Sequence, residues 1–224
     1  MRMTKSTRIL IALAGIAILA FAAWESGRRG LEDWRSMRSR RDVAGWGGGA
    51  AAPSEAYWLR NVQTLRDTLR RSPRDPEIWE TLGKAYEFGS RKFAPPGWTA
   101  YDEFALIHYR QAAALRPTSP YSWAGIAVLK LRLNQLDPEF SAALVNAMQY
   151  GPWEPGIQML ASDFGLSLWD RMDPAFRALM NENFRRTAVH QADQLVKSAI
   201  LRGRVGVLCD LSLDSLKNRL KCPG

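Results

Sequence analysis

The sequence predicts an all-α protein in which a single apolar helix at the N-terminus precedes a helical body. Three observations lead to this prediction. An uncharged apolar stretch lies near the start of the chain, helix-start signals recur along the rest, and no strand-like pattern occurs apart from the short apolar run Val205–Leu208. The chain has 224 residues, of which 46% are hydrophobic and 24% are charged. This ordinary globular composition excludes wholesale disorder.

The apolar stretch, residues 9–24, predicts a single transmembrane anchor within residues 1–41. Its residues rise about 24 Å as a helix, slightly less than the ~30 Å of a hydrocarbon core. Arginine side chains on its flanks can snorkel and extend the span, and Trp24 and Trp34 stand where interfacial aromatics are common. Residues 1–50 carry a net charge of +5 and the other 174 carry +4. This clustering favours a lipid bilayer over nucleic acid as the partner, and we expect no nucleic acid.

A cleaved signal peptide is the main alternative, because Ala20-Phe21-Ala22 has the small-residue spacing of a cleavage site. A buried core helix is a third alternative. Both of the first two interpretations target a bacterial-type inner membrane. The three basic residues before the stretch and the six after it would by themselves keep the body in the cytoplasm. A short basic tail is nevertheless typical of exported chains, so we expect a single-pass inner-membrane protein with a periplasmic body.

Residues 42–54, DVAGWGGGAAAPS, are rich in Gly and Ala and predict a flexible tether. From Ser54 onward, Ser or Asp residues stand directly before five expected helices, and four of these residues are followed at once by proline. A proline at the first helical position lacks only an N–H that would be unpaired anyway. The five capping residues are Ser54, Asp75, Ser119, Asp137 and Asp173. They predict helix–turn–helix units joined by short loops.

The segment Trp79–Tyr86 has the pattern W-x2-L-G-x2-Y. The next expected helix places Ala105, Tyr109 and Ala112 in the order A-x3-Y-x2-A, and Pro117 follows it. Together these two helices resemble one tetratricopeptide repeat (TPR). In such a pair the small residues let the helix backbones approach closely, while the aromatic side chains fill the space between them.

Two further units are expected from the same resemblance. The second begins at Pro120, with Trp123 in the aromatic position, and the third begins near Gln158 and contains Phe164-Gly165. The first two units are 44 and 38 residues long, whereas the family repeat has about 34.

The resemblance covers about residues 54–190 and implies a TPR-like α-solenoid over residues 55–190. Such an array needs a cap, so residues 191–224 are expected to form a capping helix and a cysteine-containing tail. Cys209 and Cys222 could close a small disulfide loop if the body is exported, and the sequence leaves open whether they pair. Two thiols and two histidines are too few for an expected metal site.

Recognisable catalytic motifs are missing from the sequence. It contains no P-loop, no dinucleotide-binding glycine pattern, no zinc-protease motif and no nucleophile elbow. We therefore expect neither an enzyme nor a bound cofactor.

In TPR proteins the first helices of successive units line a concave groove that holds an extended peptide or a partner helix. The resemblance thus implies a protein partner and a groove made of Lys84, Phe88, Tyr121, Val128, Leu131, Arg132 and Trp169. A second candidate contact is the insertion at residues 89–100, with Arg91, Lys92 and Trp98. Alternatively, the insertion is an ordinary loop from which Trp98 packs back onto the helices.

These inferences favour a membrane-anchored TPR scaffold or adaptor that holds a membrane-associated protein partner in a cell-envelope assembly. Analogy with anchored members of the family points to polysaccharide biosynthesis or export. The alternative is a secreted periplasmic module that is released by signal-peptide cleavage and binds a peptide or a glycan.

Overall fold

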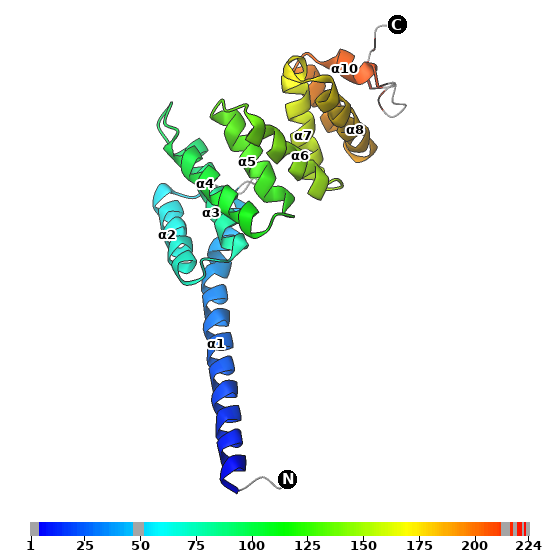
Figure 1. Ribbon diagram of the computed structural model, residues 1–224. Helices are drawn as coiled ribbons and strands as arrows, with labels where there is room; N and C mark the ends of the chain where they lie inside the picture. Colours follow the sequence, from blue (N-terminus) through cyan, green and yellow to red (C-terminus); the bar gives the residue numbers. More distant parts are fainter. Residues whose placement is uncertain (1–4, 47–51, 212–215, 217–218, 221, 223–224) are drawn as a thin grey trace.

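The structure, a computed structural model, describes residues 5–46, 52–211, 216, 219–220 and 222, and the regular secondary structure there is helical. Within these residues there is no strand, which confirms the predicted all-α class and the N-terminal apolar helix (Figure 1). The helices are α1 (Lys5–Gly45), α2 (Glu55–Arg71), α3 (Pro76–Lys92), α4 (Ala100–Leu115), α5 (Pro120–Arg132), α6 (Pro138–Tyr150), α7 (Pro155–Leu168), the 3-10 helix η1 (Trp169–Arg171), α8 (Pro174–His190), α9 (Ala192–Leu201) and α10 (Val205–Cys209).

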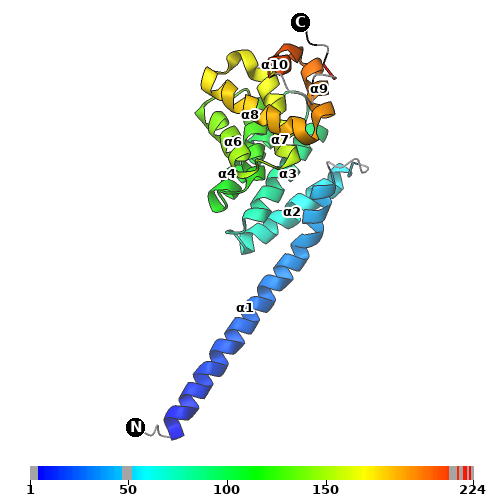
Figure 2. The same cartoon turned by 90° about the vertical axis from the view of Figure 1, so that its right-hand side faces the viewer.

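Helix α1 is 41 residues long and projects from the body for most of its length (Figures 1 and 2). Its segment Leu10–Arg28 has a mean hydropathy of 1.8, is 0% buried against the rest of the chain, and is long enough to cross a membrane. A signal sequence near an N-terminus has the same length and composition. The described part of the chain therefore contains one apolar helix that fits either role.

The C-terminal end of α1 packs against the body. Val43 is 6% exposed, and the ring of Trp46 lies 5.1 Å from the ring of Phe88 on α3. The first four residues of the expected tether, 42–45, are thus helical, because burial of this apolar face stabilises the last turn of α1. Residues 47–51 of the expected tether lie outside the described residues.

The helix starts follow the capping signals of the sequence. The side chains of Asp75, Asp137 and Asp173 each accept a hydrogen bond from a backbone N–H in the first turn of the helix that follows. Ser119 differs, because its hydroxyl donates to Glu80 at 3.0 Å and makes no capping bond. Its helix begins at the following proline all the same.

Three connections, those before α3, α5 and α7, share one local geometry. In each, a side chain in the first turn of the helix donates a hydrogen bond to the carbonyl oxygen of a proline six residues earlier. The pairs are Trp79 with Pro73 (2.9 Å), Trp123 with Pro117 (2.6 Å) and Gln158 with Pro152 (2.8 Å). The three helices begin at Pro76, Pro120 and Pro155, so the second spacing is 35 residues and not the expected 38.

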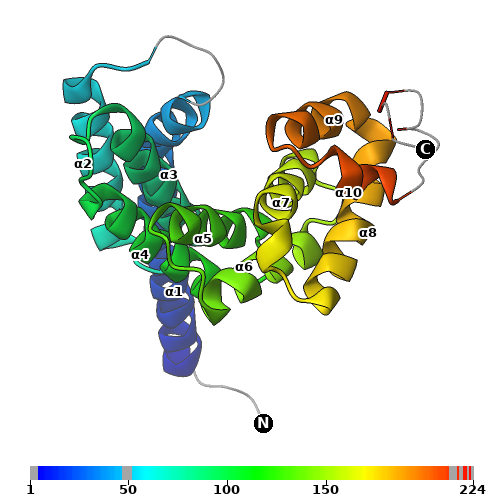
Figure 3. The same cartoon turned by 90° about the horizontal axis from the view of Figure 1, so that it is seen from above.

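The helices form two rows. The odd-numbered helices from α1 to α9 contact one another in series, and the even-numbered helices pack against them. Seen from above, the body follows an arc from α2 to α9 (Figure 3). Its buried apolar side chains form one main cluster that extends from Val43 on α1 to Leu220 in the tail.

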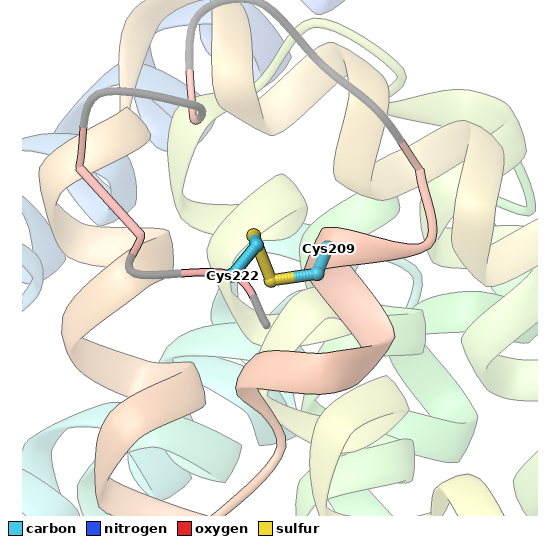
Figure 4. Close-up of a disulfide and its surroundings, with 2 residues drawn as sticks. All are labelled: Cys209 and Cys222. Atoms are coloured by element: carbon cyan, nitrogen blue, oxygen red, sulfur yellow. A yellow bond between two sulfur atoms is a disulfide. The ribbon is translucent and has the colours of Figure 1, made fainter. Parts of the chain in front are cut away.

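The tail differs from the sequence pattern in one respect. The apolar run Val205–Leu208 lies in α10 and is helical. The structure joins Cys209 to Cys222 by a disulfide with a Cα–Cα distance of 5.6 Å (Figure 4). Leu216 and Leu220, between the two cysteines, are 1% and 6% exposed, so these two side chains belong to the main core.

Candidate binding pocket between α1, α3 and α5

A pocket of about 330 Å³ lies where the end of α1 meets α3 and the start of α5. We call it the α1–α3–α5 pocket. Its lining residues come from these three helices and from the α4–α5 connection, and they are Arg40, Val43, Ala44, Glu77, Glu80, Thr81, Lys84, Arg116 and Tyr121. Three of these side chains are cationic and two are acidic, so the lining carries an excess of one positive charge.

Glu80 binds several of the polar side chains in and around the pocket. Its side chain is 7% exposed and accepts hydrogen bonds from Lys84 Nζ at 2.8 Å and from the hydroxyls of Ser119 and Ser122 at 3.0 and 2.7 Å. Arg116 Nη2 lies 3.3 Å away. Burial alone would raise the pKa of this carboxyl, but the charge of Lys84 and the hydrogen bonds outweigh it and hold the pKa below its ordinary value. Glu80 is therefore ionised near neutral pH and ties α3 to the α4–α5 connection.

Lys84 and Tyr121, two of the expected groove residues, meet at the rim of the pocket. The ammonium group of Lys84 lies 5.7 Å from the centre of the Tyr121 ring. The Tyr121 hydroxyl donates to Glu154 at 2.6 Å, and this hydrogen bond raises the pKa of Tyr121. Tyr121 is 45% exposed, so its ring is accessible beside a cation.

Phe88 does not line a groove as expected, because it is 5% exposed and covered by Trp46 from the end of α1. Because the sequence predicted a flexible tether at Trp46, the contact between Trp46 and Phe88 was not expected. Val128 and Leu131, on α5, are half-buried and pack against the main core. They add little accessible surface.

The remaining two expected groove residues are fixed by neighbouring helices. Arg132 pairs with Asp102 on α4 at 2.9 Å and donates to the Ser90 hydroxyl on α3 at 2.9 Å. Trp169, at the start of η1, is half-buried and lies 6.1 Å from the ring of Phe184 on α8. The structure thus brings together Lys84 and Tyr121 and separates Arg132 and Trp169 from them.

The expected insertion is shorter in the structure than in the sequence interpretation. Arg91 and Lys92 belong to the last turn of α3, where both are exposed and Arg91 lies 3.7 Å from Glu87. Trp98 is in the loop and contacts Tyr101 at 4.9 Å between ring centres, yet it remains 48% exposed. Trp98 thus packs onto α4, as the ordinary-loop alternative expected, but only in part.

Sequence reasoning did not select Arg40 and Arg116 for this site. Arg40 lies 2.9 Å from Glu77 and belongs to the last turns of α1. One sequence pattern could have indicated that this end of α1 packs against the body. Ser36, Ser39 and Val43 recur at helical spacing, and the structure buries all three. The two serines are polar, so an apolar face was not evident.

The chemistry of the pocket fits binding of an acidic group. Its carboxylates already have cationic neighbours, and a ligand carboxylate would meet Lys84, Arg116 and an aromatic ring. Among the described residues, no group of three or more His, Cys, Asp or Glu side chains is placed to hold a metal ion. The chain matches no protein-family model and no curated protein.

Proposed function

We propose that this chain is a single-pass, membrane-anchored adaptor whose helical body, of the TPR type, holds a protein partner. The observation that carries the proposal is the position of α1. The same helix contains the apolar segment Leu10–Arg28 and, further along, supplies Arg40, Val43 and Ala44 to the α1–α3–α5 pocket. A partner bound there touches the anchor helix and the body at once, so binding fixes it next to the membrane.

The repeated connections support the TPR part of the proposal. The bonds from Trp79, Trp123 and Gln158 to the prolines six residues earlier repeat the same turn in successive units. Contact of the odd-numbered helices in series is the arrangement expected when first helices stack along one wall. The second spacing, 35 residues, lies close to the period of this family.

The partner we propose presents an acidic segment. The pocket lining has one more cation than acid, and Lys84 and Tyr121 offer a charged group and an aromatic face side by side. Aromatic residues and arginine are enriched where protein partners bind, and Tyr121 and Arg116 supply both types in this pocket, while Lys84 adds a second cation. We therefore expect the segment to place a carboxylate beside Lys84 and an apolar side chain against Tyr121.

The disulfide between Cys209 and Cys222 supports a body outside the cytoplasm, because such bonds persist in oxidising compartments. We therefore place the proposed adaptor in a bacterial inner membrane with its body in the periplasm. By analogy with anchored TPR proteins, polysaccharide biosynthesis or export is the assembly that we favour.

The second candidate is a secreted periplasmic binding module. One observation supports it: Arg28, which lines a pocket with the α2–α3 connection, and the buried residues Ser36 and Val43 all lie beyond Ala22, so cleavage after Ala22 leaves the packed end of α1 in place. N-terminal sequencing of the mature protein distinguishes the two candidates. A mature chain that begins at Ala23 contradicts the anchor, and a chain that keeps residues 9–24 contradicts release.

Site-specific photo-crosslinking in intact cells tests the adaptor. A photoreactive amino acid at Tyr121 is compared with the same group at Tyr150, which is 39% exposed at the end of α6 and outside the pocket. The proposal expects one protein to be trapped from Tyr121 but not from Tyr150, and expects Lys84→Glu to reduce its capture. Equal capture from both positions, or capture unaffected by Lys84→Glu, contradicts a partner site in the pocket.

A further inference from the structure

A second pocket lies between α1 and the α2–α3 connection, just beyond the apolar segment. It has a volume of about 570 Å³, and its lining residues are Arg28, Ser36, Arg71, Ser72, Pro73, Arg74, Asp75 and Ile78. We call it the juxtamembrane pocket. Residues 71–75 are distant from Arg28 in the sequence, and folding brings their side chains to the last residue of the apolar segment.

Among the described lining residues, three arginines and one aspartate give an excess of positive charge. Asp75 is engaged by the start of α3, since its carboxylate accepts the N–H groups of Glu77 and Ile78 at 2.9 and 3.4 Å. Arg28 is held by Glu25 through hydrogen bonds of 3.0 and 2.8 Å, and its side chain stays 40% exposed. Among the described residues, Arg71 and Arg74 form no ion pair, and both are exposed.

The pocket lies at the depth of lipid head groups if Leu10–Arg28 spans a bilayer. Arg28 and Ser36 are eight residues apart, about 12 Å along a helix. A head-group layer is about 5–8 Å thick on each side of the hydrocarbon core. The Arg28 end of the pocket then falls within this layer, and the α2–α3 connection stands at the end of the body from which α1 projects (Figures 1 and 2).

We infer that the juxtamembrane pocket binds the phosphate of an anionic phospholipid head group, with Arg71 and Arg74 as its main contacts. This inference rests on the anchor in the proposed function. Arginine forks match phosphate oxygens, and the end of a membrane-spanning helix brings lipid phosphates within reach. Binding of the head group holds the α2–α3 connection against the membrane surface and so fixes the tilt of the body relative to α1.

The test uses the full-length chain in nanodiscs of phosphatidylcholine mixed with phosphatidylglycerol. The phosphatidylglycerol that stays bound after mild detergent release is counted by native mass spectrometry. Arg71→Gln with Arg74→Gln should reduce this retention about five-fold for each arginine removed. Arg71→Lys with Arg74→Lys should lose less retention than the Gln pair but stay below wild type, because the charges remain while the guanidinium forks are lost.

The matched control is Arg185→Gln with Lys197→Gln, which removes two exposed cations from α8 and α9 and should leave retention unchanged. Equal retention by the Arg71/Arg74 variant overturns the inference. Displacement of the lipid by inorganic phosphate alone also overturns it, because the site would then bind free phosphate. The anchor is checked separately: release of the wild-type chain from membranes by alkaline carbonate contradicts the proposed function itself.

Discussion

The ring of Tyr109 on α4 lies directly against Gly125 on α5, where an added Cβ atom would meet the ring atoms Cε2 and Cζ at 2.6 Å. The other side of this contact is Gly83 on α3, where a Cβ would meet the ring at 3.0 Å. Tyr109 is 2% exposed, and its hydroxyl donates to Glu87 at 3.1 Å. One aromatic ring thus sets the approach of three helices, and the two glycines make that approach possible.

Gly125→Ala should destabilise the body by about 1–3 kcal/mol, because the new methyl group overpacks against the Tyr109 ring. Alanine is the better helix former by about 1 kcal/mol, so a loss of stability would report the steric contact and not the helix propensity. A temperature melt of the full-length chain, followed by circular dichroism, measures the change. Gly156→Ala is the matched control, since no atom lies within 4 Å of its added Cβ and its melt should stay equal or rise. A Gly125→Ala melt that also rises contradicts the packing of α4 on α5.

The starts of several helices were predictable from the sequence because capping residues and prolines act locally. Asp75, Asp137 and Asp173 each cap the helix that follows them, as their spacing indicated. The contact between Tyr109 and Gly125 was not predictable, because it joins two units and depends on how α5 rotates against α4. Within-unit patterns such as W-x2-L-G-x2-Y do not specify that rotation.

Of the seven expected groove residues, two line the α1–α3–α5 pocket, namely Lys84 and Tyr121. The ammonium group of Lys84 and the ring of Tyr121 meet at the rim of this pocket. Phe88 does not line the pocket, because the end of α1 covers it with Trp46. A Gly-rich segment carries a weak helical signal, so only tertiary packing shows that 42–45 continue the helix.

Glu80→Gln should destabilise the body by about 1.5–3 kcal/mol at neutral pH, since a buried ionised acceptor loses its charge while Lys84, Ser119 and Ser122 keep their donors. The effect should depend on pH. A carboxyl with a lowered pKa binds fewer protons in the folded chain than in the unfolded chain, so its stabilising contribution is present above its ordinary value of 4.5. That contribution is lost as the pH falls through the lowered pKa.

Chemical unfolding of wild type and Glu80→Gln at a series of pH values measures this dependence. The difference in unfolding free energy should be largest at neutral pH and shrink below pH 4.5. Glu55→Gln, an exposed change on α2, serves as the control and should cost no more than about 0.5 kcal/mol. A difference for Glu80→Gln that stays constant down to acidic pH would disprove the role assigned to its charge.

Removal of both cysteines, by Cys209→Ala with Cys222→Ala, should destabilise the tail, since closing a loop of this length contributes about 3 kcal/mol. Hydrogen exchange should show faster opening of α10, which begins four residues before Cys209. Alkylation followed by mass spectrometry checks the bridge in the wild-type chain, which should take up label at both thiols only after reduction. Full labelling without a reductant would rule out the disulfide and remove its support for a periplasmic body.

Trp46→Ala should release the end of α1 from α3, because the Trp46 ring covers Phe88 at 5.1 Å between ring centres. The cost should be about 2 kcal/mol, below the 3–5 kcal/mol of a fully buried aromatic, since Trp46 is half-buried. Spin labels on the exposed residues Arg38 of α1 and Lys92 of α3 report the effect as a distance distribution. Trp46→Ala should broaden this distribution in the full-length chain.

Trp34→Ala is the control for this measurement, because Trp34 is on the same helix but 69% exposed, and its loss should leave the distribution narrow. A narrow distribution in Trp46→Ala would mean that the last turns of α1 hold their place through other contacts, such as the pair between Arg40 and Glu77. A broad one would have a functional consequence. Since α1 supplies one wall of the α1–α3–α5 pocket, its release should also reduce partner capture from Tyr121 without any change in Tyr121 itself.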